Sequence, residues 1–152
     1  MKIYIDDLRT PVDNTWVVVR NIQEFTELVE KTPFETIKKI SFDHDLGKFA
    51  MNQFYVNVSE YEDIDYNYIH DHGEYTGKDC AKWLINYFYK LYGHPVIYPR
   101  PNFYFPECNV HSANVVGKYN IAGLLESFFR FERITEFNVT MLNIEHTADD
   151  NF

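Results

Sequence analysis

Short apolar runs alternate along the chain with longer segments whose apolar residues recur every three or four positions. The short runs have the length and the β-branched and aromatic content of buried strands. We expect strands at residues 2–6, 16–19, 37–42, 103–110 and 137–144. The run 103–110 contains Pro106, and because proline cannot donate to a sheet ladder, we expect a bulge or an entry bend there.

The helical spacing is most regular between residues 76 and 93. Its apolar positions are Cys80, Trp83, Leu84, Tyr87, Phe88 and Leu91. Thr76 and Asp79 have the form of a capping box at the start of this helix, and Gly93 provides the stop. The same spacing predicts one helix after the N-cap residue Asn21 and another that carries Ile121, Leu124, Leu125 and Phe128.

Strands that alternate with helices predict an α/β fold with a mainly parallel sheet. Residues 7–15, which join the first two strands, are fewer than the roughly twelve that a parallel crossover normally needs. The direction of the second strand is therefore left open. Residues 48–75 are acidic and tyrosine-rich and fit no period, so we expect an insertion over the strand ends. Residues 1–146 then form one domain, followed by a polar tail at 147–152.

The composition narrows the range of functions. With 152 residues and a hydrophobic content of 45%, the chain can build one packed core. A formal net charge of −9 argues against an extended nucleic-acid groove, but it permits a single phosphate group where a metal reverses the local charge. Two cysteines are too few for a disulfide framework, and the chain shows neither a signal peptide nor a membrane span. We therefore expect a cytoplasmic protein without a membrane partner.

Candidate chemistry gathers where the predicted strands end. Asp6 and Asp7 close the first strand, and Asp43 and Asp45 flank His44 after the third. The carboxyl ends of parallel strands meet at one edge of a sheet, where open α/β sheets bind their ligands. Carboxylates crowded there repel one another unless a cation lies between them, so we expect a Mg²⁺ or Mn²⁺ site. Either acidic pair alone has a simpler explanation, because such residues often cap the turn after a strand.

A third strand end strengthens this interpretation. His111, Ser112 and Asn114 follow the predicted strand 103–110. Their side chains can transfer a proton or donate hydrogen bonds to a phosphate group. Thr76 and Lys78 stand at the start of a predicted helix, where free amides can also hold an anion, although capping alone explains the threonine.

These motifs together carry a family resemblance. They are Ile5-Asp6-Asp7-Leu8-Arg9, Ser41-Phe42-Asp43-His44-Asp45-Leu46-Gly47, Thr76-Gly77-Lys78-Asp79 and His111-Ser112-Ala113-Asn114. From residue 1 to residue 130 the chain resembles the cyclic-phosphate-processing receiver-like domains, a divergent branch of the response-regulator receiver fold. The resemblance implies a flavodoxin-like three-layer α/β sandwich. It also implies a hydrolase that acts on cyclic phosphates, such as the 2′,3′-cyclic ends met in RNA repair.

The resemblance assigns roles to particular residues. In ordinary receivers an acidic pair after the first strand and an aspartate after the third hold Mg²⁺, and Asp6, Asp7 and Asp43 match these positions. Ser112 matches the serine or threonine that follows the fourth strand. The receiver's lysine after the fifth strand has no clear match, which weakens a phosphorelay function. The nearest substitutes are Lys118 and Lys78.

The leading hypothesis is a metal-dependent phosphoesterase that opens a cyclic phosphate on a small molecule or an RNA end. Its metal ligands would be Asp6, Asp7 and Asp43, with Asp45 as a further ligand or as a partner that orients a histidine. His111 or His44 would transfer the proton. The phosphate group would be bound by Ser112, Asn114, Thr76, Lys78 and Lys118. Two alternatives remain open: a non-catalytic receiver-like module that binds a nucleotide or a protein, and a phosphoacceptor receiver with Asp43 as acceptor.

Overall fold

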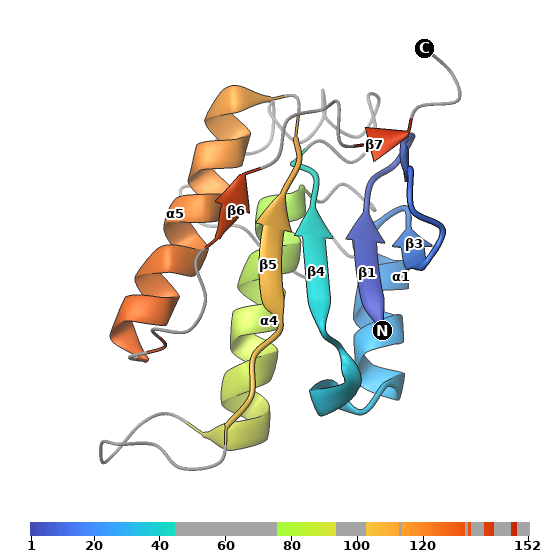
Figure 1. Cartoon of the computed structure of the whole chain (residues 1–152). Helices are drawn as coiled ribbons and strands as arrows, with labels where there is room; N and C mark the ends of the chain where they lie inside the picture. Colours follow the sequence, from blue (N-terminus) through green and yellow to red (C-terminus); the bar gives the residue numbers. More distant parts are fainter. Residues whose placement is uncertain are drawn as a thin grey trace.

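A parallel five-stranded sheet forms the centre of the molecule. The computed structural model describes residues 1–44, 76–93, 103–112, 114–132, 134, 139–141 and 147–148. The strands are β1 (Lys2–Ile5), β3 (Trp16–Val19), β4 (Lys39–Phe42), β5 (Glu107–Val110) and β6 (Thr140–Met141), in the order β3-β1-β4-β5-β6 (Figure 1). Every pairing is parallel, including that of β3 with β1, whose direction the sequence left open. This arrangement confirms the predicted α/β class with a receiver-like, parallel sheet.

Three described helices cover one face of this sheet. They are α1 (Ile22–Lys31), α4 (Gly77–Tyr92) and α5 (Val115–Phe131), and they lie behind the strands in Figure 1. Each joins one strand to the next in the same direction across the sheet, and because such crossovers are right-handed, all three fall on the same side. The strands contribute their inward alternate residues to the core: Ile3, Ile5, Ile40, Phe42, Cys108 and Val110.

The connection between β1 and β3 runs in the opposite direction and contains no helix. It contains instead the short strand β2 (Thr10–Pro11), which pairs antiparallel with β7 (Thr147–Ala148). The segment expected as a polar tail therefore begins with a strand. Because no helix covers the second face of the sheet within the ranges that the structure describes, the three-layer part of the fold prediction stays untested. The expected insertion at 48–75 and Asp45 lie outside the described residues.

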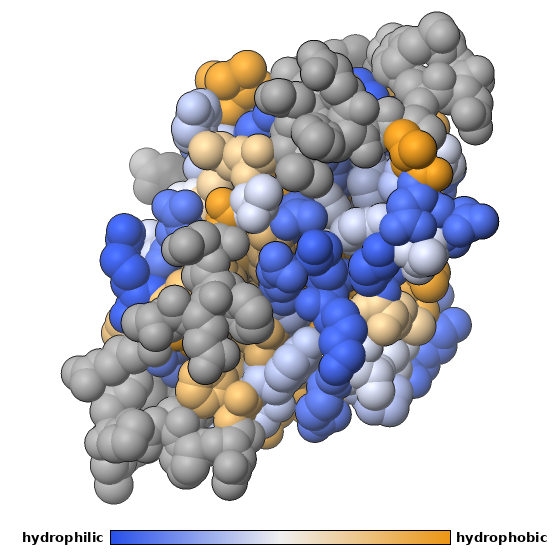
Figure 2. Space-filling model, in the orientation of Figure 1, coloured by the Kyte–Doolittle hydropathy of each residue, from blue (hydrophilic) through white to orange (hydrophobic). Residues whose placement is uncertain are grey.

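The second face of the sheet is polar. Lys2, Lys39 and Glu107 lie half-buried on it, and Figure 2, which views this face, shows hydrophilic side chains gathered across the middle of the molecule. Lys39 Nζ lies 3.6 Å from Glu107 Oε2 across β4 and β5. Further along the same face, Tyr4 and Ser41 are buried and lie beneath the carboxyl ends of the strands.

Local signals in the sequence account for most element boundaries. Asn21 caps α1 as predicted, with its Oδ1 accepting from the amide of Glu24 at 2.8 Å. At the start of α4, Asp79 Oδ2 accepts from the amide of Thr76 at 3.0 Å, which confirms the predicted capping box. The predicted strand 103–110 is shorter than expected: β5 begins at Glu107, directly after Pro106, because proline cannot join the ladder. None of the described helices combines the length and apolar character that crossing a membrane requires.

Candidate functional site

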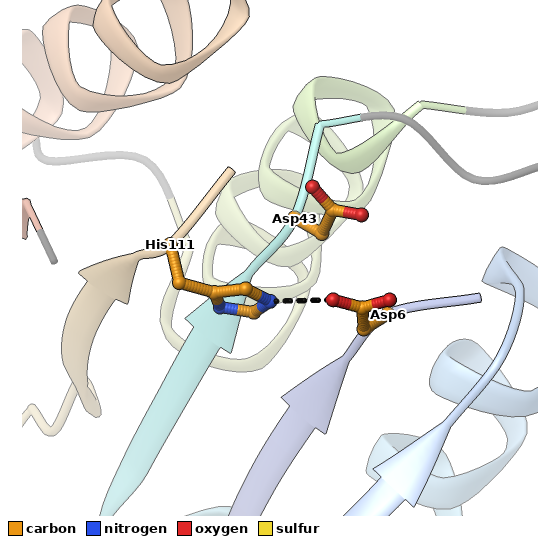
Figure 3. A group of neighbouring side chains, drawn as sticks. All are labelled: Asp6, Asp43 and His111. Atoms are coloured by element: carbon orange, nitrogen blue, oxygen red, sulfur yellow. Dashed lines mark hydrogen bonds and ion pairs between the residues drawn. The ribbon is translucent and has the colours of Figure 1, made fainter. Parts of the chain in front are cut away.

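Three strand ends converge at one edge of the sheet. Asp6, Asp43 and His111 each follow the last residue of a strand: β1, β4 and β5, respectively. The backbone ladder continues through them, since Asp43 N donates to Ile5 O at 2.9 Å and His111 N donates to Phe42 O at 3.0 Å. One carboxylate oxygen from each aspartate and one ring nitrogen of the histidine, atoms of the kind that can bind a metal, all lie within 4.8 Å of one another (Figure 3). The group lies where the strand order reverses, at the crevice where open α/β sheets bind ligands.

Asp6 is fully buried and is held by its own turn. Its Oδ1 accepts from the amides of Leu8 at 2.9 Å and Arg9 at 2.8 Å, and its Oδ2 lies 3.2 Å from His111 Nε2. Burial alone would raise the pKa of Asp6, but the hydrogen bonds from His111 and from the two amides outweigh it and lower that pKa below its ordinary value. Asp6 is therefore a carboxylate at neutral pH.

His111 is a neutral imidazole whose two nitrogens both have partners. Burial lowers the pKa of His111, against the opposing effect of the Asp6 carboxylate. Nδ1 lies 2.7 Å from Ser41 Oγ, and the ring stacks on Tyr4 with centroids 4.1 Å apart. Because the Asp6 carboxylate can only accept, Nε2 carries the proton, and Nδ1 accepts from the Ser41 hydroxyl.

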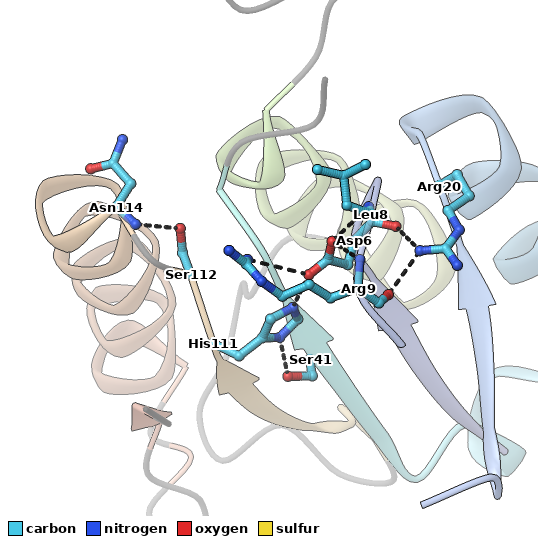
Figure 4. A network of polar contacts seen from close by, with 8 residues as sticks. All are labelled: Asp6, Leu8, Arg9, Arg20, Ser41, His111, Ser112 and Asn114. Carbon is cyan, nitrogen blue, oxygen red and sulfur yellow. Dashed lines mark hydrogen bonds and ion pairs between the residues drawn. The ribbon is translucent and has the colours of Figure 1, made fainter. Parts of the chain in front are cut away.

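Two arginines complete the surroundings of Asp6 (Figure 4). Arg9 Nη1 lies 3.8 Å from Asp6 Oδ2. Arg20, at the end of β3, donates from Nη1 to the carbonyl oxygen of Asp6 at 3.0 Å and to that of Arg9 at 2.8 Å. Neither arginine was predicted from the sequence to belong to the site. Arg9 could have been identified as a neighbour of Asp6 from its position three residues further along the chain. Arg20 could not, because its place near Asp6 depends on β3 lying beside β1.

The N-terminus of α5 lies next to His111. Asn114 caps this helix, with Oδ1 accepting from the amide of Gly117 at 2.9 Å, and Ser112 Oγ accepts from the amide of Asn114 at 3.1 Å. Lys118, in the first turns of α5, is close enough for its charge to act on the His111 ring. The structure thus brings together His111, Ser112, Asn114 and Lys118, four of the residues that the sequence singled out.

Other predicted site residues are outside the group formed by Asp6, Asp43 and His111. The His44 ring packs against Gly117 of α5. The approach is so close that a Cβ added at Gly117 would lie 2.2 Å from His44 Cγ. Thr76 is buried, and its hydroxyl donates to Asp79 Oδ2 at 3.1 Å, so the hydroxyl is engaged in capping. Lys78 lies in the same first turn, and Asp7 is half-buried beside Asp6 but is outside the three-residue group.

A parallel sheet of this strand order, with aspartates after β1 and β4 and polar residues after β5, defines a receiver-like α/β domain. The model of the cyclic-phosphate processing receiver domain family matches residues 1–127. The chain belongs to this family, as its motifs predicted. No curated protein and no solved structure gives a significant match to it.

Proposed function

We propose that this protein is a metal-dependent phosphoesterase that opens cyclic phosphates, either at 2′,3′-cyclic RNA ends or in cyclic nucleotides. One observation carries the proposal: Asp6, Asp43 and His111, from three separate strands, place their metal-binding atoms within 4.8 Å of one another. Membership of the cyclic-phosphate processing family supports the choice of substrate class.

The carboxylates fit a hard divalent ion such as Mg²⁺ or Mn²⁺. Two oxygens bound to one Mg²⁺ lie at most about 4.2 Å apart, so the observed separation of 4.8 Å or less needs only small side-chain adjustments. Asp6 is already ionised, and Asp6 and Asp43 are both buried, at 0% and 3% exposure. When bound, such an ion polarises a phosphoryl oxygen and lowers the pKa of a coordinated water.

The chain also supplies donors for a phosphate group. The Arg9 guanidinium lies beside Asp6, and the N-terminus of α5 presents the positive end of its helix dipole near His111. Ser112 Oγ accepts from the amide of Asn114, and a hydroxyl that accepts one hydrogen bond can also donate one, here to a phosphoryl oxygen. These groups offset, at the site, the acidic charge of the whole chain.

The contacts of His111 argue against direct proton transfer to or from the substrate. Both ring nitrogens are already bonded within the protein, to Asp6 and to Ser41. A general base must reach the proton that it removes. His44 packs against Gly117 instead of joining the group, so it supplies no substitute in this geometry.

A hydrolysis assay with matched variants tests the proposal. Metal-stripped protein is supplied with Mn²⁺ or Mg²⁺ and given 2′,3′-cyclic nucleotides, 3′,5′-cyclic nucleotides and an RNA oligonucleotide with a 2′,3′-cyclic end. We expect metal-dependent ring opening that falls by about 100-fold or more in Asp43→Asn. Asp13→Asn is the control, because Asp13 is an exposed aspartate that pairs with Lys2 at 3.0 Å, away from the site.

Other outcomes would reassign the site. Turnover that is equal in Asp43→Asn and the wild type would contradict the proposal. Tight binding of a cyclic nucleotide without turnover would make the domain a binding module, and stable labelling of Asp43 by a small phosphodonor would make it a phosphoacceptor receiver.

A further inference from the structure

We propose that His111 is itself a metal ligand, bound through Nε2, with Ser41 holding the other ring nitrogen. The centre would then contain two carboxylates and one imidazole and would select Mn²⁺, Co²⁺ or Zn²⁺ over Mg²⁺. This inference rests on the metal centre of the proposed function, and it makes His111 a ligand instead of the general acid or base that the sequence suggested.

The position of the ring is the first argument. Nε2 faces Asp6, because it lies 3.2 Å from Asp6 Oδ2, whereas Nδ1 lies against Ser41. A ring nitrogen of His111 also lies within 4.8 Å of a carboxylate oxygen of Asp43 (Figure 3). An ion shared by Asp6 and Asp43 would therefore meet a ring nitrogen with a lone pair once the Nε2 proton has moved.

The surroundings of the ring are the second argument. Tyr4 stacks on the imidazole at an interplanar angle of 11°. Ser41 Oγ lies 2.7 Å from Nδ1 (Figure 4), so the ring is already oriented. Histidines that bind metals almost always donate their second N–H to an outer partner, which fixes the tautomer. Ser41 is fully buried on the neighbouring strand β4 and is placed for this role.

Ser41 can hydrogen-bond the His111 ring both without and with a bound ion, because a hydroxyl can either donate or accept. Without an ion, Nε2–H donates to Asp6, and Ser41 donates to Nδ1. With an ion on Nε2, the proton is carried on Nδ1 and donates to Ser41 Oγ. The histidine remains neutral in both states, so the exchange of tautomer needs no change of net charge.

The third argument is the kind of metal ion that two carboxylates and one imidazole prefer. Imidazole nitrogen suits transition ions and zinc, whereas sites that contain only oxygen suit Mg²⁺. Mg²⁺ also dehydrates reluctantly and usually keeps several waters. Asp6, Asp43 and His111 are all at most 3% exposed, so an ion among them must give up most of its water. We therefore expect Mn²⁺ to bind at least about 100-fold more tightly than Mg²⁺.

Electron spin-echo spectroscopy of the Mn²⁺-loaded chain tests the ligand directly, because it detects a nitrogen nucleus bound to the ion. We expect a directly bound nitrogen in the wild type, its loss in His111→Gln, and a fall in Mn²⁺ affinity of about 10–100-fold in that variant. Ser41→Ala should keep the nitrogen signal and weaken binding by about 10-fold. His44→Gln is the matched control, since His44 is also buried but lies against Gly117, and it should retain the full signal.

The result separates this inference from the proposed function, because the spectrum requires no turnover. A nitrogen signal that depends on His111 in a protein without activity would support the ligand assignment and contradict the enzyme. Mn²⁺-dependent hydrolysis with no bound nitrogen, or with a nitrogen signal that persists in His111→Gln, would overturn the ligand assignment alone. Failure of the wild type to bind Mn²⁺ would overturn both.

Discussion

The main chain of Asp43 lies directly against Gly77. A Cβ added at position 77 would lie 1.6 Å from the carbonyl oxygen of Asp43 and 2.7 Å from its carbonyl carbon. The amide of Gly77 also donates to the carbonyl oxygen of His44 at 2.8 Å. The start of α4 is therefore fitted to the strand end that carries Asp43, a proposed metal ligand, and only glycine allows this approach.

Gly77→Ala should destabilise the protein by more than about 2 kcal/mol, because the atom that the new methyl group meets is backbone and cannot rotate away. Gly123→Ala is the control: Gly123 is exposed on α5, with nothing within 4 Å of an added Cβ. This second change should stabilise the protein by up to about 1 kcal/mol through helix propensity. Urea unfolding of the two variants measures both effects, and equal effects would contradict the packing described.

His44 and Gly117 should be energetically coupled. An alanine at 117 would place its methyl group 2.2 Å from His44 Cγ, so the ring would have to move. We expect Gly117→Ala to destabilise the wild type but to cost at least about 1 kcal/mol less in a His44→Ala background, where the space is empty. A double-mutant cycle from unfolding curves measures the coupling. Additive changes would show that the ring does not occupy this space.

Arg20 should influence the proposed metal centre through the turn that holds Asp6. Arg20→Met keeps much of the side chain but removes the donors to the carbonyl oxygens of Asp6 and Arg9. We expect a loss of about 1–3 kcal/mol in unfolding free energy and a fall of about 10-fold in metal affinity. Arg130→Met, at an exposed arginine of α5, should change neither. An unchanged metal affinity in Arg20→Met would contradict the positioning role.

Asp79 should make stability depend on pH. Burial raises the pKa of this carboxyl above its ordinary value of 3.8, although Thr76 donates to it. Its Oδ1 is buried and has no hydrogen-bond partner among the residues that the structure describes. The folded state therefore holds the proton more tightly than the unfolded state, and this contribution to stability is lost as pH rises through the folded pKa. As the pH rises from about 4 to about 7, the unfolding free energy of Asp79→Asn should increase relative to that of the wild type. A difference that is independent of pH would contradict this expectation.

The parts of the fold that local signals control could be predicted from the sequence. The apolar runs gave β1, β3 and β4, and the caps at Asn21 and Thr76 gave the starts of two helices, because these features depend on residues a few positions apart. The convergence of Asp6 and Asp43 followed from placing both after parallel strands. The direction of β3 could not be predicted. It is set by the pairing of β3 with β1, and the residues of the short link between the two strands do not determine it.

The contacts that define the site in detail could not be predicted in this way. Asp6 and His111 are 105 positions apart, and Ser41 and His111 are 70 positions apart. Which ring nitrogen faces which partner depends on strand register, and a shift of one residue would turn each side chain to the opposite face. The same holds for Arg20, whose role depends on β3 lying beside β1. Sequence spacing identified the residue types at the site but not their partners.

A calorimetric titration of the metal-stripped chain with Mn²⁺ tests the account most directly, because everything proposed requires Asp6 and Asp43 to share one ion. We predict one ion per wild-type chain and a loss of affinity of about 100-fold or more in Asp6→Asn and in Asp43→Asn. Asp13→Asn, at an exposed aspartate outside the site, should bind as the wild type does. No binding by the wild type, or equal binding by the Asp43→Asn and Asp13→Asn variants, would contradict the account.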